Sequence, residues 1–140
     1  MPSVQPPSGF RDFINQDASR RLHLIHRIAK VYESFGFLPL ETSALESLDV
    51  LLGGGGGEEN EKLIFKVLKR GEKLQTALAS GPESIESKIA EFGLRFDMTV
   101  PLSRAVAAYR NQIHFPWKVF HVGSVWRAER PQKGRFREFT

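Results

Sequence analysis

The chain contains no cysteine among its 140 residues. This absence excludes disulfide bonds, thiol catalysis and zinc sites built on cysteine. Long apolar runs are also missing, because no stretch approaches the roughly 18 residues that a membrane-spanning helix needs. Residues 1–9 lack the basic and then apolar order of a secretory signal. We therefore expect no membrane segment and a cytoplasmic location.

The composition is that of a globular protein. Hydrophobic residues make up 41% of the chain, and they include eleven phenylalanines. A chain of this length forms one domain and buries about 68% of its extended surface. The net charge of +4 is modest, but nine Lys and Arg stand against three Asp and Glu in residues 95–140. This asymmetry favours an anionic ligand for the last third of the chain, or simply a solvated basic surface.

Periodicity predicts an α+β fold. An extended arm over residues 1–17 leads into an amphipathic helix over residues 18–35, with Leu22, Ile25, Ile28, Ala29, Tyr32 and Phe35 facing inward. Strands are predicted over residues 37–42, 62–68, 73–78, 93–97 and 117–126, the last covered on both faces. Residues 80–92 read as a loop or short helix. A further helix is predicted to begin at a Thr99 cap and to point Leu102, Ala105, Val106 and Tyr109 inward.

Five consecutive glycines at residues 53–57 raise the possibility of a phosphate-binding loop. No Gly-Lys-Ser/Thr follows them, and the next residues include Glu58, Glu59 and Glu61, which would repel phosphate. We interpret this run as a flexible connector.

The end of the chain concentrates positive charge around a Pro/Gly turn. Residues 125–140 carry Arg127, Arg130, Lys133, Arg135 and Arg137 on a predicted hairpin. Strand alternation would turn Arg127 and Glu129 to one face, and Arg135, Arg137 and Phe139 to one face after the turn. Guanidinium groups suit phosphate oxygens, and an aromatic ring can stack on a base, so a nucleotide site is one interpretation. A surface hairpin with Arg–Glu ion pairs is the other.

A second constellation lies in residues 94–102. Asp97 and Thr99 alternate across Met98 and would face the same way at the end of a strand. A carboxylate beside a hydroxyl can hold a ligand's ammonium group. The same residues can instead cap the helix that follows. The four histidines show no metal-ligand spacing, and we expect no metal site in the chain.

These blocks together resemble a known family. The long helix followed by residues 36–42 is similar to motif 1 of class II aminoacyl-tRNA synthetases, and residues 125–139 resemble their motif 2. Residues 8–12 (Ser-Gly-Phe-Arg-Asp), 94–101 and 129–139 resemble histidyl-tRNA synthetases within that class. The resemblance covers nearly the whole chain in the expected order.

The resemblance implies a class II synthetase-like antiparallel sheet with flanking helices, present here in incomplete form. Motif 1, at about residues 18–46, would pack at a homodimer interface, and motif 2 would occupy about residues 117–140. The implied reaction joins L-histidine and ATP, with Mg²⁺, into histidyl-adenylate, and then transfers the histidyl group to tRNA(His).

Matching the motifs implies a role for individual residues. Asp97 and Thr99 would hold the α-amino group of histidine. Arg127 would be the catalytic arginine that bridges the α-phosphate and the substrate carboxylate. Glu129 would lie near the adenine amino group, Arg135 would reach the outer phosphates, and adenine would stack on Phe139.

The chain also departs from the family pattern. Ser43 stands where motif 1 usually has a proline. Motif 3, the histidine-specific segment and the anticodon-binding domain are absent, so we expect a fragment of a longer enzyme that is inactive alone. The alternatives are a synthetase-like regulatory subunit of ATP phosphoribosyltransferase and a non-catalytic dimerisation fragment.

Overall fold

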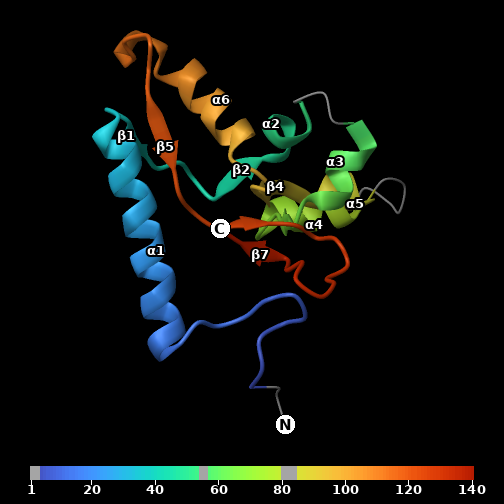
Figure 1. Cartoon of the computed structure of the whole chain (residues 1–140). Helices are drawn as coiled ribbons and strands as arrows, with labels where there is room; N and C mark the ends of the chain where they lie inside the picture. Colours follow the sequence, from blue (N-terminus) through green and yellow to red (C-terminus); the bar gives the residue numbers. More distant parts are fainter. Residues whose placement is uncertain (1–3, 54–56, 80–84) are drawn as a thin grey trace.

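A computed structural model describes residues 4–53, 57–79 and 85–140. The helices are α1 (Asn15–Ser34), α2 (Leu48–Leu52), α3 (Gly57–Leu63), α4 (Glu72–Ala79), α5 (Ile85–Ile89), α6 (Thr99–Ala108) and the 3₁₀ turn η1 (Arg110–Gln112). The strands are β1 (Leu38–Leu40), β2 (Leu45–Ser47), β3 (Lys66–Leu68), β4 (Ala90–Leu94), β5 (Val119–His121), β6 (Val125–Trp126) and β7 (Glu138–Phe139). Figure 1 shows α1 on one side of the molecule and α2 to α5 gathered on the other. No helix in the described ranges has the length and apolarity needed to cross a bilayer.

The strands form three small sheets. β4 lies between β2 and β3 in an antiparallel sheet, and β6 pairs antiparallel with β7. The predicted antiparallel character holds for these two sheets. It is wrong for β1 and β5, which pair in parallel with Leu38 opposite Val119.

The core lies between the three-stranded sheet and its helices. Leu48 and Leu51 of α2 pack with Ile64, Ala90 and Phe96. Gly93 of β4 allows this close approach, because a Cβ there would lie 2.5 Å from Cγ2 of Ile64. This core holds β4 in place, and with it the segment that leads to Asp97.

The predicted strand over residues 117–126 is wrong as a single element. It divides into β5 and β6, with Val122, Gly123 and Ser124 between them. Arg95 explains the break: its Nε donates to the Ser124 carbonyl at 2.9 Å, and a Cβ on Gly123 would lie 2.6 Å from Nη2 of Arg95. The buried guanidinium occupies the space that a straight strand would need, and the chain bends around it.

Helix α1 forms as predicted, but it starts three residues earlier, at Asn15, and buries none of its residues. Ile25 and Ala29 are half-buried. Leu22, Ile28, Tyr32 and Phe35, all predicted to face inward, are 44–68% exposed. The apolar face exists, but most of it has no cover within the described part of the chain.

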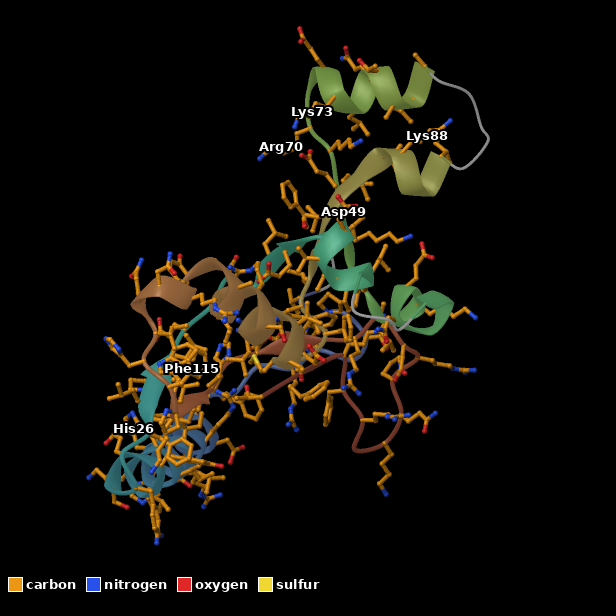
Figure 2. The ribbon with its side chains drawn as sticks, turned by 90° about the horizontal axis from the view of Figure 1, so that it is seen from above. His26, Asp49, Arg70, Lys73, Lys88 and Phe115 are labelled. Carbon is orange, nitrogen blue, oxygen red and sulfur yellow. The ribbon has the colours of Figure 1, made fainter. Side chains whose placement is uncertain are left out.

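The strand predicted over residues 73–78 is a helix, α4. Leu74, Ala77 and Leu78 follow the i, i+3, i+4 spacing of a helical face, and Ala77 is buried. The strand predicted over residues 62–68 is confirmed only in β3, because α3 continues to Leu63. Figure 2 shows α4 and α5 side by side at the end of the molecule opposite His26 of α1, with Lys73 and Lys88 on them.

The remaining predictions are confirmed in part. The arm is free of helix and strand from residue 4 to residue 14. Residues 80–92 contain the short helix α5, and β4 starts three residues before the predicted strand at Gly93. Tyr109 is 53% exposed and does not face inward. The centre of the predicted glycine connector, residues 54–56, lies outside the described residues, as do residues 80–84.

Candidate functional site

The terminal hairpin encloses a cavity of about 370 Å³. Four residues to which the family resemblance gives a nucleotide-binding role line it together: Arg127, Glu129, Arg135 and Phe139. The other lining residues are Arg11, Arg130, Pro131, Gly134 and Phe136. Four arginines and one glutamate therefore surround this space, and its walls include two aromatic rings. Such a lining suits a ligand that is both anionic and planar.

The hairpin is held at both of its ends. Val125 pairs with Phe139, and Trp126 with Glu138, where β6 meets β7. At the turn, the Gln132 and Arg135 amides each donate to the other residue's carbonyl, at 3.0 and 2.9 Å. Gly134 has φ +78°, a conformation that residues with a side chain rarely adopt. The glycine thus permits the tight turn that brings Arg135 back toward Glu129.

Arg127 is fixed by contacts on two sides. Its Nε donates to the Phe96 carbonyl at 3.3 Å, and its Cζ lies 5.2 Å from the centroid of the Phe139 ring. The side chain is half-buried. The guanidinium is therefore oriented beside an aromatic ring in the cavity wall by contacts within the chain.

Glu129 and Arg135 form a loose ion pair, with Oε2 and Nη1 3.9 Å apart and side chains 39% and 63% exposed. A pair this exposed contributes at most about 1 kcal/mol. The surface-pair interpretation of the hairpin is thus partly realised. Because the pair is weak, an anion that attracts Arg135 would separate it from Glu129 at a small cost in free energy.

Arg137 corrects one prediction. It does not line the cavity with Arg127 and Arg135. Its Nε instead donates to the Glu129 carbonyl at 2.9 Å, and its Nη1 donates to the Ser8 carbonyl at 3.4 Å. Strand alternation fails here because β7 begins only at Glu138.

Arg11 is a cavity residue that the sequence analysis did not single out. It lies in the Ser8–Asp12 segment, 116 residues before Arg127 in the chain. Only the resemblance marked that segment, and its spacing indicated no chemistry.

Asp97 and Thr99 lie outside this cavity, at the start of α6. The Asp97 Oδ1 accepts hydrogen bonds from the amides of Thr99 and Val100, at 3.1 and 3.2 Å. Asp97 therefore satisfies two amides of the first turn from the position before the N-cap residue, Met98, and the prediction that Thr99 caps the helix is wrong, since Thr99 is its first residue. The Phe96 carbonyl that binds Arg127 directly precedes Asp97, so the two constellations are joined through the backbone.

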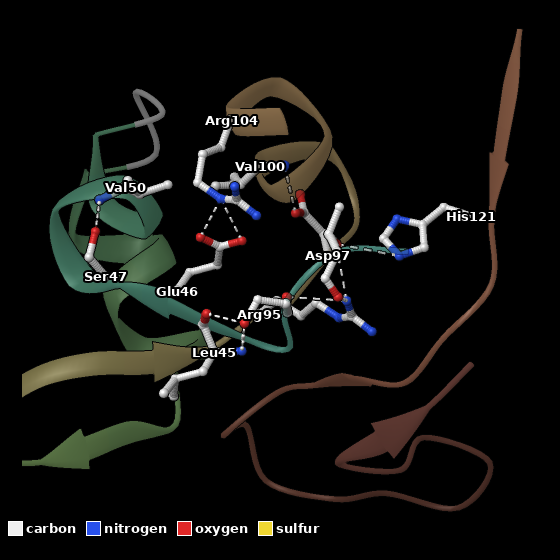
Figure 3. A network of polar contacts seen from close by, with 11 residues as sticks. Leu45, Glu46, Ser47, Val50, Arg95, Asp97, Val100, Arg104 and His121 are labelled. Carbon is white, nitrogen blue, oxygen red and sulfur yellow. Dashed lines mark hydrogen bonds and ion pairs between the residues drawn. The ribbon is translucent and has the colours of Figure 1, made fainter. Parts of the chain in front are cut away.

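A buried arginine supports this junction (Figure 3). Arg95 is 6% exposed, and its Nη1 donates to the carbonyls of Thr42 and Ser43, at 2.9 and 3.3 Å. Burial lowers the pKa of Arg95 from its usual value, while the charge of Glu46 acts in the opposite direction. An arginine directly between two large apolar residues, Leu94 and Phe96, is the sequence signal that could have indicated this buried charge.

Two neighbours complete the network in Figure 3. Glu46, with 4% of its side chain exposed, accepts from Nε of Arg104 at 2.7 Å. The Nε2 of His121 lies 3.4 Å from the Thr42 hydroxyl, and its Nδ1 is buried without a hydrogen-bond partner among the described residues. Burial, and then the charge of Arg95, lower the pKa of His121, and Glu41 partly offsets them.

No metal centre is evident. Within residues 4–53, 57–79 and 85–140, no three His, Cys, Asp or Glu side chains gather as a metal site. Glu129 is the one carboxylate in the cavity lining, and it pairs with Arg135. These residues do not form a protein-built magnesium site, which would need more oxygen ligands.

Comparison with known proteins identifies the relatives of the chain. No family model matches it. A histidine–tRNA ligase of Porphyromonas gingivalis is 46% identical over 143 residues, which cover 99% of this chain and 31% of that protein. A histidine–tRNA ligase of Treponema denticola is 41% identical and is covered over 27% of its length. This chain is a relative of the histidine–tRNA ligases.

Solved structures agree with this family. The histidyl-tRNA synthetase of Nostoc sp. PCC 7120 matches with a TM-score of 0.72 and 31% identity, over 98% of this chain and 27% of that one. A Bacillus halodurans protein described as an ATP phosphoribosyltransferase regulatory subunit/histidyl-tRNA synthetase also matches with a TM-score of 0.72. Because its sequence is only 21% identical, this match shows the fold alone. The predicted α+β synthetase-like fold is confirmed. The chain spans about a third of the length of the histidine–tRNA ligases that it matches.

Proposed function

We propose that the complete protein containing this chain is a histidine–tRNA ligase, which activates L-histidine with ATP and transfers it to tRNA(His). The observation that carries this proposal is the cavity in which Arg127, Glu129, Arg135 and Phe139 meet. The similarity to histidine–tRNA ligases along 99% of the chain supports the same reaction.

In this proposal ATP lies in the cavity of the hairpin. Adenine stacks on Phe139, and its amino group faces Glu129. Arg127 contacts the α-phosphate and the carboxylate of histidine, while Arg135 reaches the outer phosphates. The 5.2 Å contact between Arg127 and the Phe139 ring supports this order, because it puts a guanidinium next to the stacking surface.

Histidine would bind beside the cavity, through Asp97 and Thr99. One Asp97 oxygen is engaged with the start of α6, which holds the carboxylate in a fixed orientation. The other oxygen could accept from the ammonium group of the amino acid. The bond from Arg127 to the Phe96 carbonyl supports this arrangement, because it ties the ammonium site to the phosphate site.

Positioning and charge stabilisation would drive the reaction. A carboxylate oxygen of histidine attacks the α-phosphorus, a P–O bond forms, and pyrophosphate leaves with the electrons of the bond that breaks. Negative charge builds up at the phosphorus during this step. Arg127, already oriented, would offset that charge without reorganisation and without a protein nucleophile. Mg²⁺ is expected to arrive with the nucleotide, since this part of the chain builds no site for it.

The remaining expectations concern the whole protein. We propose that it works in the cytoplasm as a homodimer, with motif 1 at the interface, motif 2 in residues 117–140, and motif 3 and the anticodon-binding domain supplied outside this chain. The exposed apolar face of α1 supports a partner surface there. The regulatory-subunit alternative has less support, since the likeness to the Bacillus halodurans protein, at 21% identity, shows the fold alone. The non-catalytic dimerisation fragment is the other alternative.

Histidine-dependent exchange of pyrophosphate with ATP tests this function in the complete gene product. Arg127→Ala should lower the exchange rate by about a hundredfold or more, because one preorganised charge on the reacting phosphate is lost. Arg70→Ala is the matched control: it removes an exposed guanidinium just before α4, outside both the cavity lining and α1. Exchange that does not require histidine, or that survives Arg127→Ala, would contradict the proposal.

A further inference from the structure

The N-terminal arm lies against the terminal hairpin. The Arg137 amide donates to the Gly9 carbonyl at 2.8 Å, and the Arg137 guanidinium reaches the Ser8 carbonyl. Farther along the chain, Nη2 of Arg21 donates to the Thr140 hydroxyl. Figure 1 shows the blue arm passing next to the red hairpin before it enters α1. The N-terminal arm and the terminal hairpin, which are far apart in the sequence, are therefore in direct contact.

Gly9 makes this approach possible. It adopts φ +87°, and a Cβ there would lie 2.8 Å from Cγ and 2.9 Å from Cδ of Arg137. A side chain would thus clash with the arginine that anchors the arm and would strain the backbone. Phe10 continues the contact into the body of the protein, with its ring centroid 5.9 Å from that of Phe65.

Arg11 connects the arm to the cavity itself. Its Cζ lies 3.9 Å from the centroid of the Phe136 ring and 4.5 Å from that of Phe13. A cation this close to two rings is attracted to both, and Arg can also stack on them. Phe136 lies between Arg135 and Arg137 in the chain, so a ring held by Arg11 restricts the backbone that carries Arg135.

We propose that Arg11 is a positioning residue for the cavity: by clamping Phe136 it sets the place of Arg135, the residue assigned to the outer phosphates. The assignment of those phosphates rests on the proposed function, whereas the clamp itself does not. The arm then adds Arg11 to the lining of the nucleotide site, from the opposite end of the sequence.

Hydrogen–deuterium exchange of the complete protein without ligand tests the clamp. In Arg11→Ala, exchange at the amides of Arg135 and Arg137 should be roughly threefold to thirtyfold faster, since two ring contacts are lost. Arg11→Lys keeps a cation over the rings and should lie closer to the unchanged protein. Arg70→Ala should leave these amides unchanged. Unchanged exchange in Arg11→Ala, or faster exchange throughout the chain, would overturn the proposal.

Steady-state kinetics tests the link to the nucleotide. Arg11→Ala should raise the KM for ATP by about fivefold, with the KM for histidine unchanged and partial recovery in Arg11→Lys. Equal effects on both KM values, or none on that for ATP, would overturn the positioning role. If the unchanged protein lacks histidine-dependent exchange, the proposed function fails, and the amide exchange still decides whether Arg11 clamps the hairpin.

Discussion

His121 is the one described residue with a buried side-chain nitrogen that makes no hydrogen bond, and it lies beside the buried Arg95. Protonating this imidazole would bring a second positive charge into a space where Arg95 already holds one. Glu41 is the one acid that acts on His121 in the opposite direction. The fold therefore favours the neutral imidazole, which holds its pKa below the ordinary value of 6.5.

This lowered pKa predicts a pH-dependent stability. Below pH 6.5 the unfolded chain takes up the His121 proton before the folded chain does, so the free energy of unfolding falls as pH decreases from about 6.5 through the lower, folded pKa. Urea unfolding of the 140-residue chain at pH 7.5 and 5.5 measures the loss. In His121→Gln, which cannot be protonated, the loss should be smaller. His114→Gln, at an exposed position, is the control, and an equal loss in His121→Gln and the unchanged chain would refute the prediction.

The sequence patterns predicted the residues of the hairpin that line the cavity better than the distant residues that contact them. Arg127, Glu129, Arg135 and Phe139 lie close in the sequence around one turn, so local geometry was enough to bring them together. Arg11 reaches the same cavity from the other end of the chain, and no short-range spacing encodes that contact. For Asp97 the pattern allowed two roles, and the structure realises the helix cap while leaving the ligand role as a proposal.

At the scale of elements, local propensity failed where tertiary contacts decided the outcome. A short segment such as residues 73–78, with apolar residues at 74, 77 and 78, fits both a strand and a helix, and packing against α5 accompanies the helix. The run from Trp117 to Trp126 had strand character throughout, but the guanidinium of Arg95 divides it. Helix α1, with its sustained periodicity over 20 residues, was predictable.

The exposed face of α1 is a stripe. Leu24, Ile28, Val31 and Phe35 follow a spacing of three and four residues and are 46–68% exposed. Apolar stripes of this kind usually mark an interface. The proposed homodimer would cover the stripe through motif 1.

This stripe predicts that substitutions on it weaken self-association of the protein but hardly change its free energy of unfolding. In the complete protein, Leu24→Glu with Val31→Glu should weaken self-association at least tenfold, as measured by sedimentation velocity over a dilution series. In the 140-residue chain the same pair should change the free energy of unfolding by less than about 1 kcal/mol, because both side chains are more than half exposed. His26→Glu, on another face of α1, is the control. Unchanged association would exclude this face as the interface.

At the scale of the whole molecule, the cavity joins three separate parts of the chain. The arm brings Arg11, the hairpin brings Arg127 and Arg135, and the segment between β4 and α6 holds Arg127 through the Phe96 carbonyl. The core around Leu51 and Ile64 fixes β4, and the Arg95 network ties β4 to the chain before β6. Cationic groups thus converge on one space from elements that are distant in sequence.

This convergence predicts how ATP binding responds to salt. Four arginines and one glutamate line the cavity, so a triphosphate should gain more from its field than a monophosphate does. Raising NaCl from 50 to 300 mM should increase the Kd of ATP several-fold in the complete protein, and that of AMP less, because salt screens the partly exposed charges. Isothermal titration calorimetry at several salt concentrations gives, for each nucleotide, the slope of log Kd against the logarithm of the NaCl concentration. Arg135→Ala should bring the ATP slope toward that of AMP, since the charge that reaches the outer phosphates is gone, whereas Arg70→Ala should leave both slopes unchanged. Equal slopes for the two nucleotides in the unchanged protein would show that the outer phosphates lie outside this cationic field.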